Sequence, residues 1–237
     1  MTEFPPAFGV APYGPPESSY DPRHYLQGVV AGAWQRAAGA RLVVHVQGPW
    51  PTVSLYPDSY VAVVEGGADG LREFAGRPEL ARDARFAFSP SPRFRVDHPD
   101  MVAIDVLMWK LALGASRGRL PVGADLGTPC RMREWPNFTR LLLTPGALEI
   151  AALWTQYTCT IAQTIEYLRL PGSDVFAFYS AVAATGFLVT EEPPPQFATL
   201  GGFPAPVPAS PPTAPPTGRA SPRRGLLRTL FDKLRSN

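Results

Sequence analysis

Proline marks off both ends of this chain and limits the part of it that can fold. Six of the first 22 residues are proline, and residues 193–222 contain eleven more. Proline has no backbone N–H and a fixed φ, so helices and central strands do not run through such segments. Their Pro, Gly and Ser content also leaves too little apolar surface to bury. We therefore expect a disordered arm at 1–22 and a semi-extended linker at 193–222.

The stretch 23–118 is predicted to form a small α+β domain. A helical apolar pattern runs from His24 to about Gly39. Three segments rich in β-branched and aromatic residues follow it, bounded by Gly and Pro. RLVVHVQG and TVSLYPDSYVAVVEGG together predict two or three strands. DARFAFSPSP is a candidate for one more strand.

A second helix is predicted at the end of this domain, in DHPDMVAIDVLMWKLALGAS. Asp97 can cap its N-terminus, Pro99 fits its first turn and Gly114 can end it. The apolar side chains between them recur at helical spacing. The next residues, 119–143, read as an irregular connector with a basic and aromatic cluster.

Three short helices and a strand are predicted for the domain at 144–192. Thr144 followed by proline can cap the first helix, and Thr160 with Gln163 fits a capping box for the second. Ser173 can cap the third, and GFLVT after Gly186 has strand character. This order is typical of a winged helix, a helix-turn-helix variant. The predicted fold class is therefore α+β, with a small sheet-plus-helices domain followed by a winged-helix domain.

The segment ALEIAALW…TIAQTIEYLRLPGSDVFAFYSAVAATGFL resembles the winged-helix segment of many bacterial regulators. Together with the preceding sheet it is similar to the PATAN domains (domain of unknown function 4388) of bacterial signalling proteins. It is also similar to proteobacterial proteins associated with Ras-like GTPases and roadblock proteins. The resemblance implies a signalling context with a small GTPase or another signalling protein as the partner.

The third predicted helix lacks the side chains that read DNA. It carries no charge between Asp174 and Glu191, and residues 145–192 hold one basic residue against five acidic ones. Reading a major groove requires Arg, Lys, Asn or Gln on the inserted helix, and duplex affinity requires phosphate contacts. We therefore expect no nucleic-acid partner, although a winged-helix transcription regulator stays the alternative function.

The two faces of this helix differ in size. The core stripe is expected to be Val175, Phe178, Tyr179 and Val182. The opposite face is small and uncharged, which suits contact with protein, and it comprises Ala177, Ser180, Ala181 and Ala184. We predict that these four residues form a protein-interaction surface. Packing against residues 23–118 of the same chain remains open as the alternative.

The last fifteen residues, 223–237, are predicted to form a short amphipathic basic helix, because a helical projection places their apolar side chains on one face. It is too short to be stable alone and is expected to fold on binding. It can dock on a partner protein, lie peripherally on an anionic membrane, or pack on its own chain. Its predicted docking residues are Arg223, Arg224, Leu226, Leu227, Arg228, Leu230, Phe231, Lys233 and Leu234.

Candidate catalytic, metal and cofactor motifs all have simpler explanations. GASRG matches the nucleophile elbow G-x-S-x-G, but it follows a helix and every histidine lies upstream of Ser116. The acids of DHPD suit a helix start, and EGGADG lacks the lysine of a phosphate-binding loop. Cys130 and Cys159 read as separate reduced thiols. We predict no catalytic residue, cofactor or metal.

The sequence as a whole predicts a cytoplasmic, non-enzymatic adaptor or regulator that acts through protein–protein contact. No run of about 20 apolar residues could cross a bilayer, and the N-terminus lacks the basic start of a signal peptide.

Overall fold

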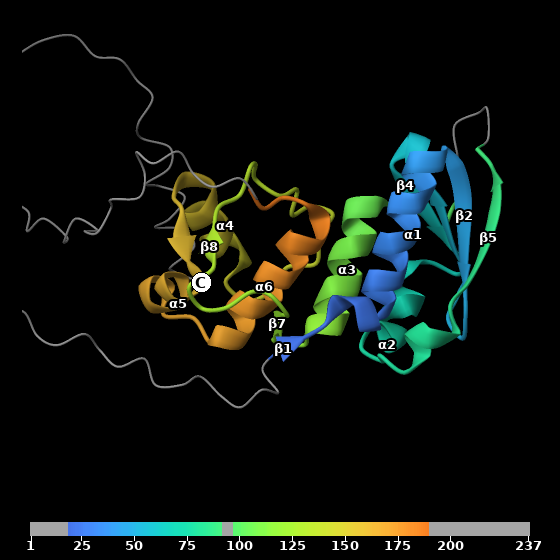
Figure 1. Ribbon diagram of the computed structural model, residues 1–237. Coiled ribbons are helices and arrows are strands. Elements are labelled where there is room, and N and C mark those ends of the chain that lie inside the picture. The colour runs from blue at the N-terminus through green and yellow to red at the C-terminus, as the bar shows by residue number, and fades with distance from the viewer. Residues whose placement is uncertain (1–18, 92–96, 190–237) are drawn as a thin grey trace, which may run out of the picture. The chain divides into compact units, whose positions relative to one another are not determined.

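The computed structural model describes residues 19–91 and 97–189. They belong to one compact unit with an α+β architecture (Figure 1). The linker 193–222 and the C-terminal helix 223–237 predicted from the sequence lie outside the described residues. The predicted disordered arm is wrong at its end, because Ser19–Tyr20 forms strand β1. This strand pairs in parallel with β7 (Leu120–Pro121).

Two tyrosines and an arginine hold β1 in place. The Tyr20 ring is buried and meets the Tyr25 ring edge to face, with 5.6 Å between centroids. The Arg119 guanidinium lies over both rings and donates to the Tyr25 hydroxyl at 3.0 Å. The Tyr20 hydroxyl donates to Oε1 of Gln27 at 3.2 Å. These contacts hold Ser19–Tyr20 as a strand although prolines are frequent in the neighbouring sequence.

A five-stranded antiparallel sheet forms the first half of the described chain, in the order β5-β2-β3-β4-β6. The three segments predicted to be strands are confirmed as strands. In the three central strands, β2, β3 and β4, every second side chain on one face of the sheet is buried, as expected for strands with one face in a core. The strands are β2 (Leu42–Gln47), β3 (Val53–Tyr56), β4 (Val61–Val64), β5 (Arg85–Pro90) and β6 (Met101–Ala103). The buried side chains are Val44, Val46, Val53, Leu55, Ala62 and Val64.

Helices cover this apolar face, with α1 and α3 on the same side of the sheet (Figure 1). The helix predicted from His24 to Gly39 is confirmed as α1, which buries Leu26, Val30 and Ala33 at helical spacing. The helices of this half are α1 (Leu26–Ala40), α2 (Arg72–Ala75) and α3 (Ile104–Ser116). Its 3₁₀ turns are η2 (Pro22–His24), η3 (Pro57–Ser59), η4 (Ala68–Leu71) and η5 (Leu80–Asp83).

Helix α3 begins later than its sequence predicts. Asp97 is not its cap; Ala103 is, because Met101–Ala103 pairs with β4 as the edge strand β6. Backbone pairing with the sheet therefore competes successfully with the helical apolar pattern at these three residues. Asp100 takes another role, since its carboxylate accepts from the Gly66 N–H at 3.2 Å.

The second half of the described chain, residues 119–189, contains three helices on a short sheet. The predicted three-helix order is confirmed, but GFLVT contributes a single bridge, Leu188 with Met132, rather than a strand. The elements of this half are β8 (Pro129–Cys130), α4 (Ala147–Gln156), β9 (Cys159–Thr160), α5 (Ile161–Leu168) and α6 (Gly172–Thr185). We call it the helical half, and residues 19–118 the sheet half.

One of the three predicted helix caps in this half is confirmed. Thr160 and Gln163 form both hydrogen bonds of a capping box, at 3.1 and 2.8 Å. The Thr144 cap is wrong, because its carbonyl closes a turn with Ala147 and α4 follows Gly146 in the left-handed region. Helix α6 likewise begins before Ser173, with Pro171 at the N-cap position.

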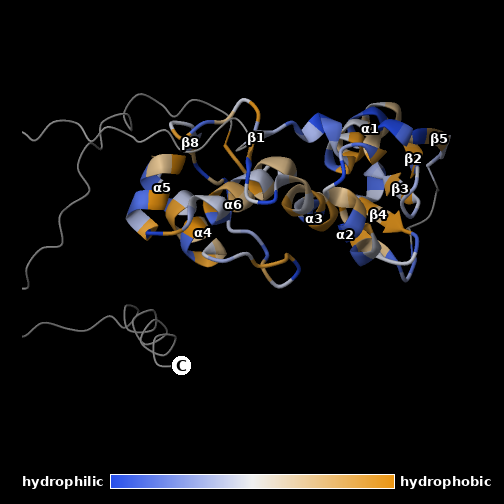
Figure 2. Ribbon diagram, turned by 90° about the horizontal axis from the view of Figure 1, so that it is seen from below, coloured by the Kyte–Doolittle hydropathy of each residue, from blue (hydrophilic) through white to orange (hydrophobic). Residues whose placement is uncertain are grey.

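Helix α3 belongs to the cores of both halves. Leu107, Met108 and Leu111 pack in the core of the sheet half. Trp109 and Ala112, on the other side of α3, pack in the core of the helical half. Both views place α3 beside α6 in the middle of the described chain (Figure 1, Figure 2). The predicted domains 23–118 and 144–192 thus meet through one shared helix.

Candidate functional site

The face of α6 predicted to bind a partner lies largely inside the protein. Ser180 and Ala181 are buried, and the Ser180 hydroxyl donates to the Phe176 carbonyl at 2.8 Å. The Ser180 hydroxyl also lies 3.2 Å from the Arg119 carbonyl, and Ala181 belongs to the core of the helical half. The prediction that these two residues contact another protein is therefore wrong, and the alternative of packing within the chain describes them. Ala177 and Ala184 are only half-buried.

The opposite stripe of α6 packs as predicted. Val175, Phe178 and Val182 are fully buried, and Tyr179 is nearly so. The Phe178 ring meets Trp154 of α4 at 5.5 Å and Trp109 of α3 at 5.6 Å between centroids. Since α6 packs on two opposite sides, little of it is left on the surface.

Ala184 lines an open groove of about 810 Å³ between α1, α3 and the C-terminal end of α6. Four larger apolar side chains line it as well, and they are Trp34, Tyr60, Ile104 and Met108. We call this cavity the Tyr60 groove. Its elements come from both halves of the chain, so it exists only in the assembled fold.

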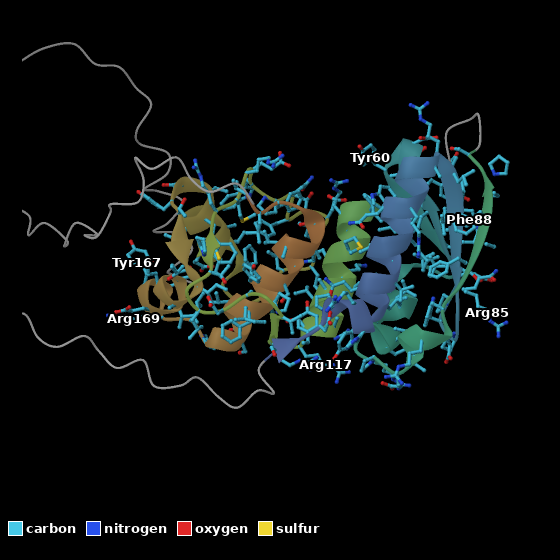
Figure 3. The ribbon with its side chains drawn as sticks, viewed as in Figure 1. Tyr60, Arg85, Phe88, Arg117, Tyr167 and Arg169 are labelled. Atoms are coloured by element: carbon cyan, nitrogen blue, oxygen red, sulfur yellow. The ribbon has the colours of Figure 1, made fainter. Side chains whose placement is uncertain are left out.

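Tyr60 is the most exposed large apolar side chain among the described residues, at 73%. Its φ is +54°, a left-handed conformation that is uncommon for a bulky residue. Two contacts hold it there: its N–H donates to the Pro57 carbonyl at 3.1 Å, and its carbonyl accepts from the Ile104 N–H at 3.2 Å. Its ring rests against Trp34, 6.1 Å between centroids. In Figure 3 the Tyr60 side chain lies at the top of the sheet half, far from Phe88 and Arg85 on its outer side.

Nothing in the sequence around Tyr60 predicts this groove. The turn PDSY carries no signal for a left-handed tyrosine, and Trp34 reads as an ordinary helical apolar residue. Only the pairing of β4 with β6 brings Tyr60 beside the start of α3.

The candidate catalytic serine is structural. Ser116 lies in the last turn of α3, is fully buried and donates to the Arg119 carbonyl at 2.7 Å. A nucleophile elbow requires an exposed serine between a strand and a helix, and Ser116 has neither property. His98 of the DHPD motif accepts from the Asp100 N–H at 3.1 Å. Among residues 19–91 and 97–189, His, Cys, Asp and Glu side chains form no group of three that could hold a metal.

The two cysteines, which the sequence presents as unrelated, lie opposite each other in the β8–β9 pair. Both thiols are free and buried, and burial raises the pKa of each above its usual value. The Sγ of Cys159 lies 3.5 Å from Oγ1 of Thr164. Their separation along the chain gives no hint of this pairing, since it depends on the connector 119–143 folding back onto α5.

Comparisons with protein-family models, curated proteins and solved structures found no match for this chain. Among the helices that the structure describes, none has the length and apolar character needed to cross a membrane.

Proposed function

We propose that this chain is a non-enzymatic adaptor or regulator in bacterial signalling that binds another protein through the Tyr60 groove. The observation that carries the proposal is Tyr60 itself, an exposed aromatic side chain held in a left-handed conformation beside Trp34. Rare backbone conformations cost free energy and cluster at functional sites. Tyrosine and tryptophan are also enriched among the hot spots of protein interfaces.

The groove suits a partner segment with one large apolar side chain. Ile104, Met108 and Ala184 give it an apolar lining, and Asp105 and Arg140 at its edge already face each other at 3.7 Å. A partner would therefore bury mainly apolar surface there. It would not have to supply a charged group, because Asp105 and Arg140 already pair with each other. An amphipathic helix or a turn that presents a leucine or phenylalanine has this chemistry.

The burial of α6 supports this proposal over DNA binding. A recognition helix must present several side chains to a groove of the duplex. Helix α6 buries seven residues, and Asp174 in its first turn would repel phosphate. We propose that α4, α5 and α6 are a winged-helix arrangement whose third helix serves packing within the chain.

The resemblance to PATAN-like signalling proteins supplies the context of this proposal. It implies a Ras-like GTPase or another signalling protein as the partner, and we propose that the two meet in the cytoplasm. The basic segment 223–237, outside the described residues, would be a second contact with that partner or with a membrane surface.

The test compares two exposed tyrosines on the full-length protein. Tyr60→Ala removes the groove's aromatic edge, whereas Tyr157→Ala removes a 52% exposed tyrosine at the end of α4 and serves as the control. Partners captured from the native host would be purified, and their affinity measured by calorimetry. For Tyr60→Ala we expect a loss of about 2 kcal/mol or more, with Tyr157→Ala close to wild type. Equal losses of binding free energy in the two variants would refute the proposal. So would a captured partner whose affinity does not change in Tyr60→Ala.

A further inference from the structure

A second groove lies between α2, the C-terminal half of α3 and residues 139–142, and has a volume of about 770 Å³. This volume is within the range of small-molecule sites. Its floor is apolar and includes Leu71, Leu111 and Leu141, all of them buried. Because four basic side chains line it, we call it the basic groove.

The charges around the basic groove are unbalanced. Its four basic residues, Arg72, Lys110, Arg117 and Arg140, face a single carboxylate, that of Asp69. Asp69 is already engaged by Lys110, with Nζ and Oδ1 2.7 Å apart. Lys110 and then Arg72 lower the pKa of Asp69, so this carboxyl is ionised at neutral pH. The remaining cations repel one another.

Arg72 and Arg117 have no ion-pair partner within 4 Å in the part of the chain that the structure describes. Arg140 has only the long contact of 3.7 Å to Asp105, which lines the other groove. Several unpaired cations beside an apolar floor attract anions, because the low-dielectric wall screens them less than water does. The planar guanidinium also matches the oxygens of a phosphate in a two-pronged hydrogen bond.

Two glycines let the walls come together. A Cβ at Gly114 of α3 would lie 2.5 Å from the Cβ of Ala75, so α2 packs directly on α3. A Cβ at Gly76 would lie 2.6 Å from Nε of Arg117, so this guanidinium lies against the Gly76 backbone. Arg117 itself is the left-handed C-cap residue of α3, with φ +48°. Figure 3 shows it at the C-terminal end of α3.

We propose that the basic groove binds a phosphorylated small molecule of about the size of a nucleotide. The phosphate lies among Arg72, Lys110 and Arg117, and the organic part rests on the leucine floor. A phosphate carries two negative charges in a small volume and can contact Arg72 of α2 together with Lys110 of α3 and its C-cap residue Arg117. The carboxylates of an extended peptide carry one charge each and lie farther apart. Arg140 lines both grooves, but Tyr60 lines only the other one and Arg72 and Arg117 only this one, so different variants test the two proposals.

The experiment measures binding to the full-length protein by calorimetry at low salt, with adenosine diphosphate, pyrophosphate and adenosine as probes. Adenosine diphosphate should bind more tightly than either of the others, because only it uses both the cations and the floor. The double variant Arg72→Gln/Arg117→Gln should weaken this binding at least tenfold. The matched control, Arg131→Gln/Arg133→Gln, removes two exposed arginines of the helical half and should change it less than twofold.

Three results would overturn the proposal. The first is that adenosine diphosphate does not bind at millimolar concentration. The second is that the two double variants weaken binding equally, which indicates nonspecific charge attraction. An oligoglutamate peptide that displaces the nucleotide and binds more tightly would identify an acidic protein segment as the occupant. Tyr60→Ala should retain nucleotide binding, so failure here is distinguishable from failure of the adaptor proposal.

Discussion

Replacing Trp109 by alanine tests whether the two halves of this protein fold as one unit. Trp109 is fully buried on α3. Its ring meets Phe178 at 5.6 Å and Phe138 at 6.3 Å between centroids. Its Nε1 donates to the Leu142 carbonyl at 2.9 Å. One side chain therefore joins the shared helix to α6 and to the connector.

The expected cost follows from these contacts. Removing a buried tryptophan side chain costs about 3–5 kcal/mol in lost burial and cavity formation. The Leu142 carbonyl adds little to this cost, because Leu142 is 58% exposed and water can replace the indole N–H. A loss of about 3–5 kcal/mol is a large share of a typical unfolding free energy of about 5–15 kcal/mol. We expect Trp109→Ala to unfold at a much lower urea concentration than the wild type.

Urea unfolding followed by circular dichroism measures this cost, and fluorescence summed over the five tryptophans is a second probe of whether unfolding is a single step. Trp50 of the sheet half and Trp154 of the helical half are buried and are natural probes. The control is Trp135→Ala, which removes a 51% exposed side chain and should cost about 1 kcal/mol or less. A wild-type transition in two separate steps, or a loss below about 1 kcal/mol for Trp109→Ala, would contradict the shared-core argument.

Three further predictions concern the helical half. Thr160→Ala should lower the free energy of unfolding in urea by about 1 kcal/mol, because the capping box with Gln163 is lost. An unchanged urea midpoint would refute this role of Thr160. Cys130 and Cys159 should react with a thiol reagent at neutral pH only after denaturation, since burial raises both pKa values; fast reaction of the native protein would mean that they are accessible. Burial raises the pKa of Tyr179 to about 12. Its contribution to stability is therefore complete below about pH 10 and is lost as the pH rises toward 12, so Tyr179→Phe should flatten the alkaline end of the stability profile.

The elements that were predictable from the sequence depend on neighbours a few residues away. The strands around Val44, Leu55 and Ala62 follow from alternation along each strand, and the capping box at Thr160 closes within three residues. The core stripe of α6, with Phe178 at its centre, follows from helical spacing. Local periodicity and local hydrogen bonds determine these features, so the sequence of neighbouring residues is sufficient to predict them.

Only the tertiary structure determines which segments far apart in the chain pair with each other. Backbone pairing with β4 turned Met101–Ala103 from helix into strand, and packing within the chain buried Ser180 and Ala181, which in sequence look like an outer face. Both grooves combine α3 with other segments, as do the contacts that place Tyr60 beside Ile104. Alanine and serine are compatible with solvent, a partner or a neighbouring helix alike. Which of these environments such a residue has depends on the distant segments that pack against it, as the Arg119 carbonyl does against Ser180.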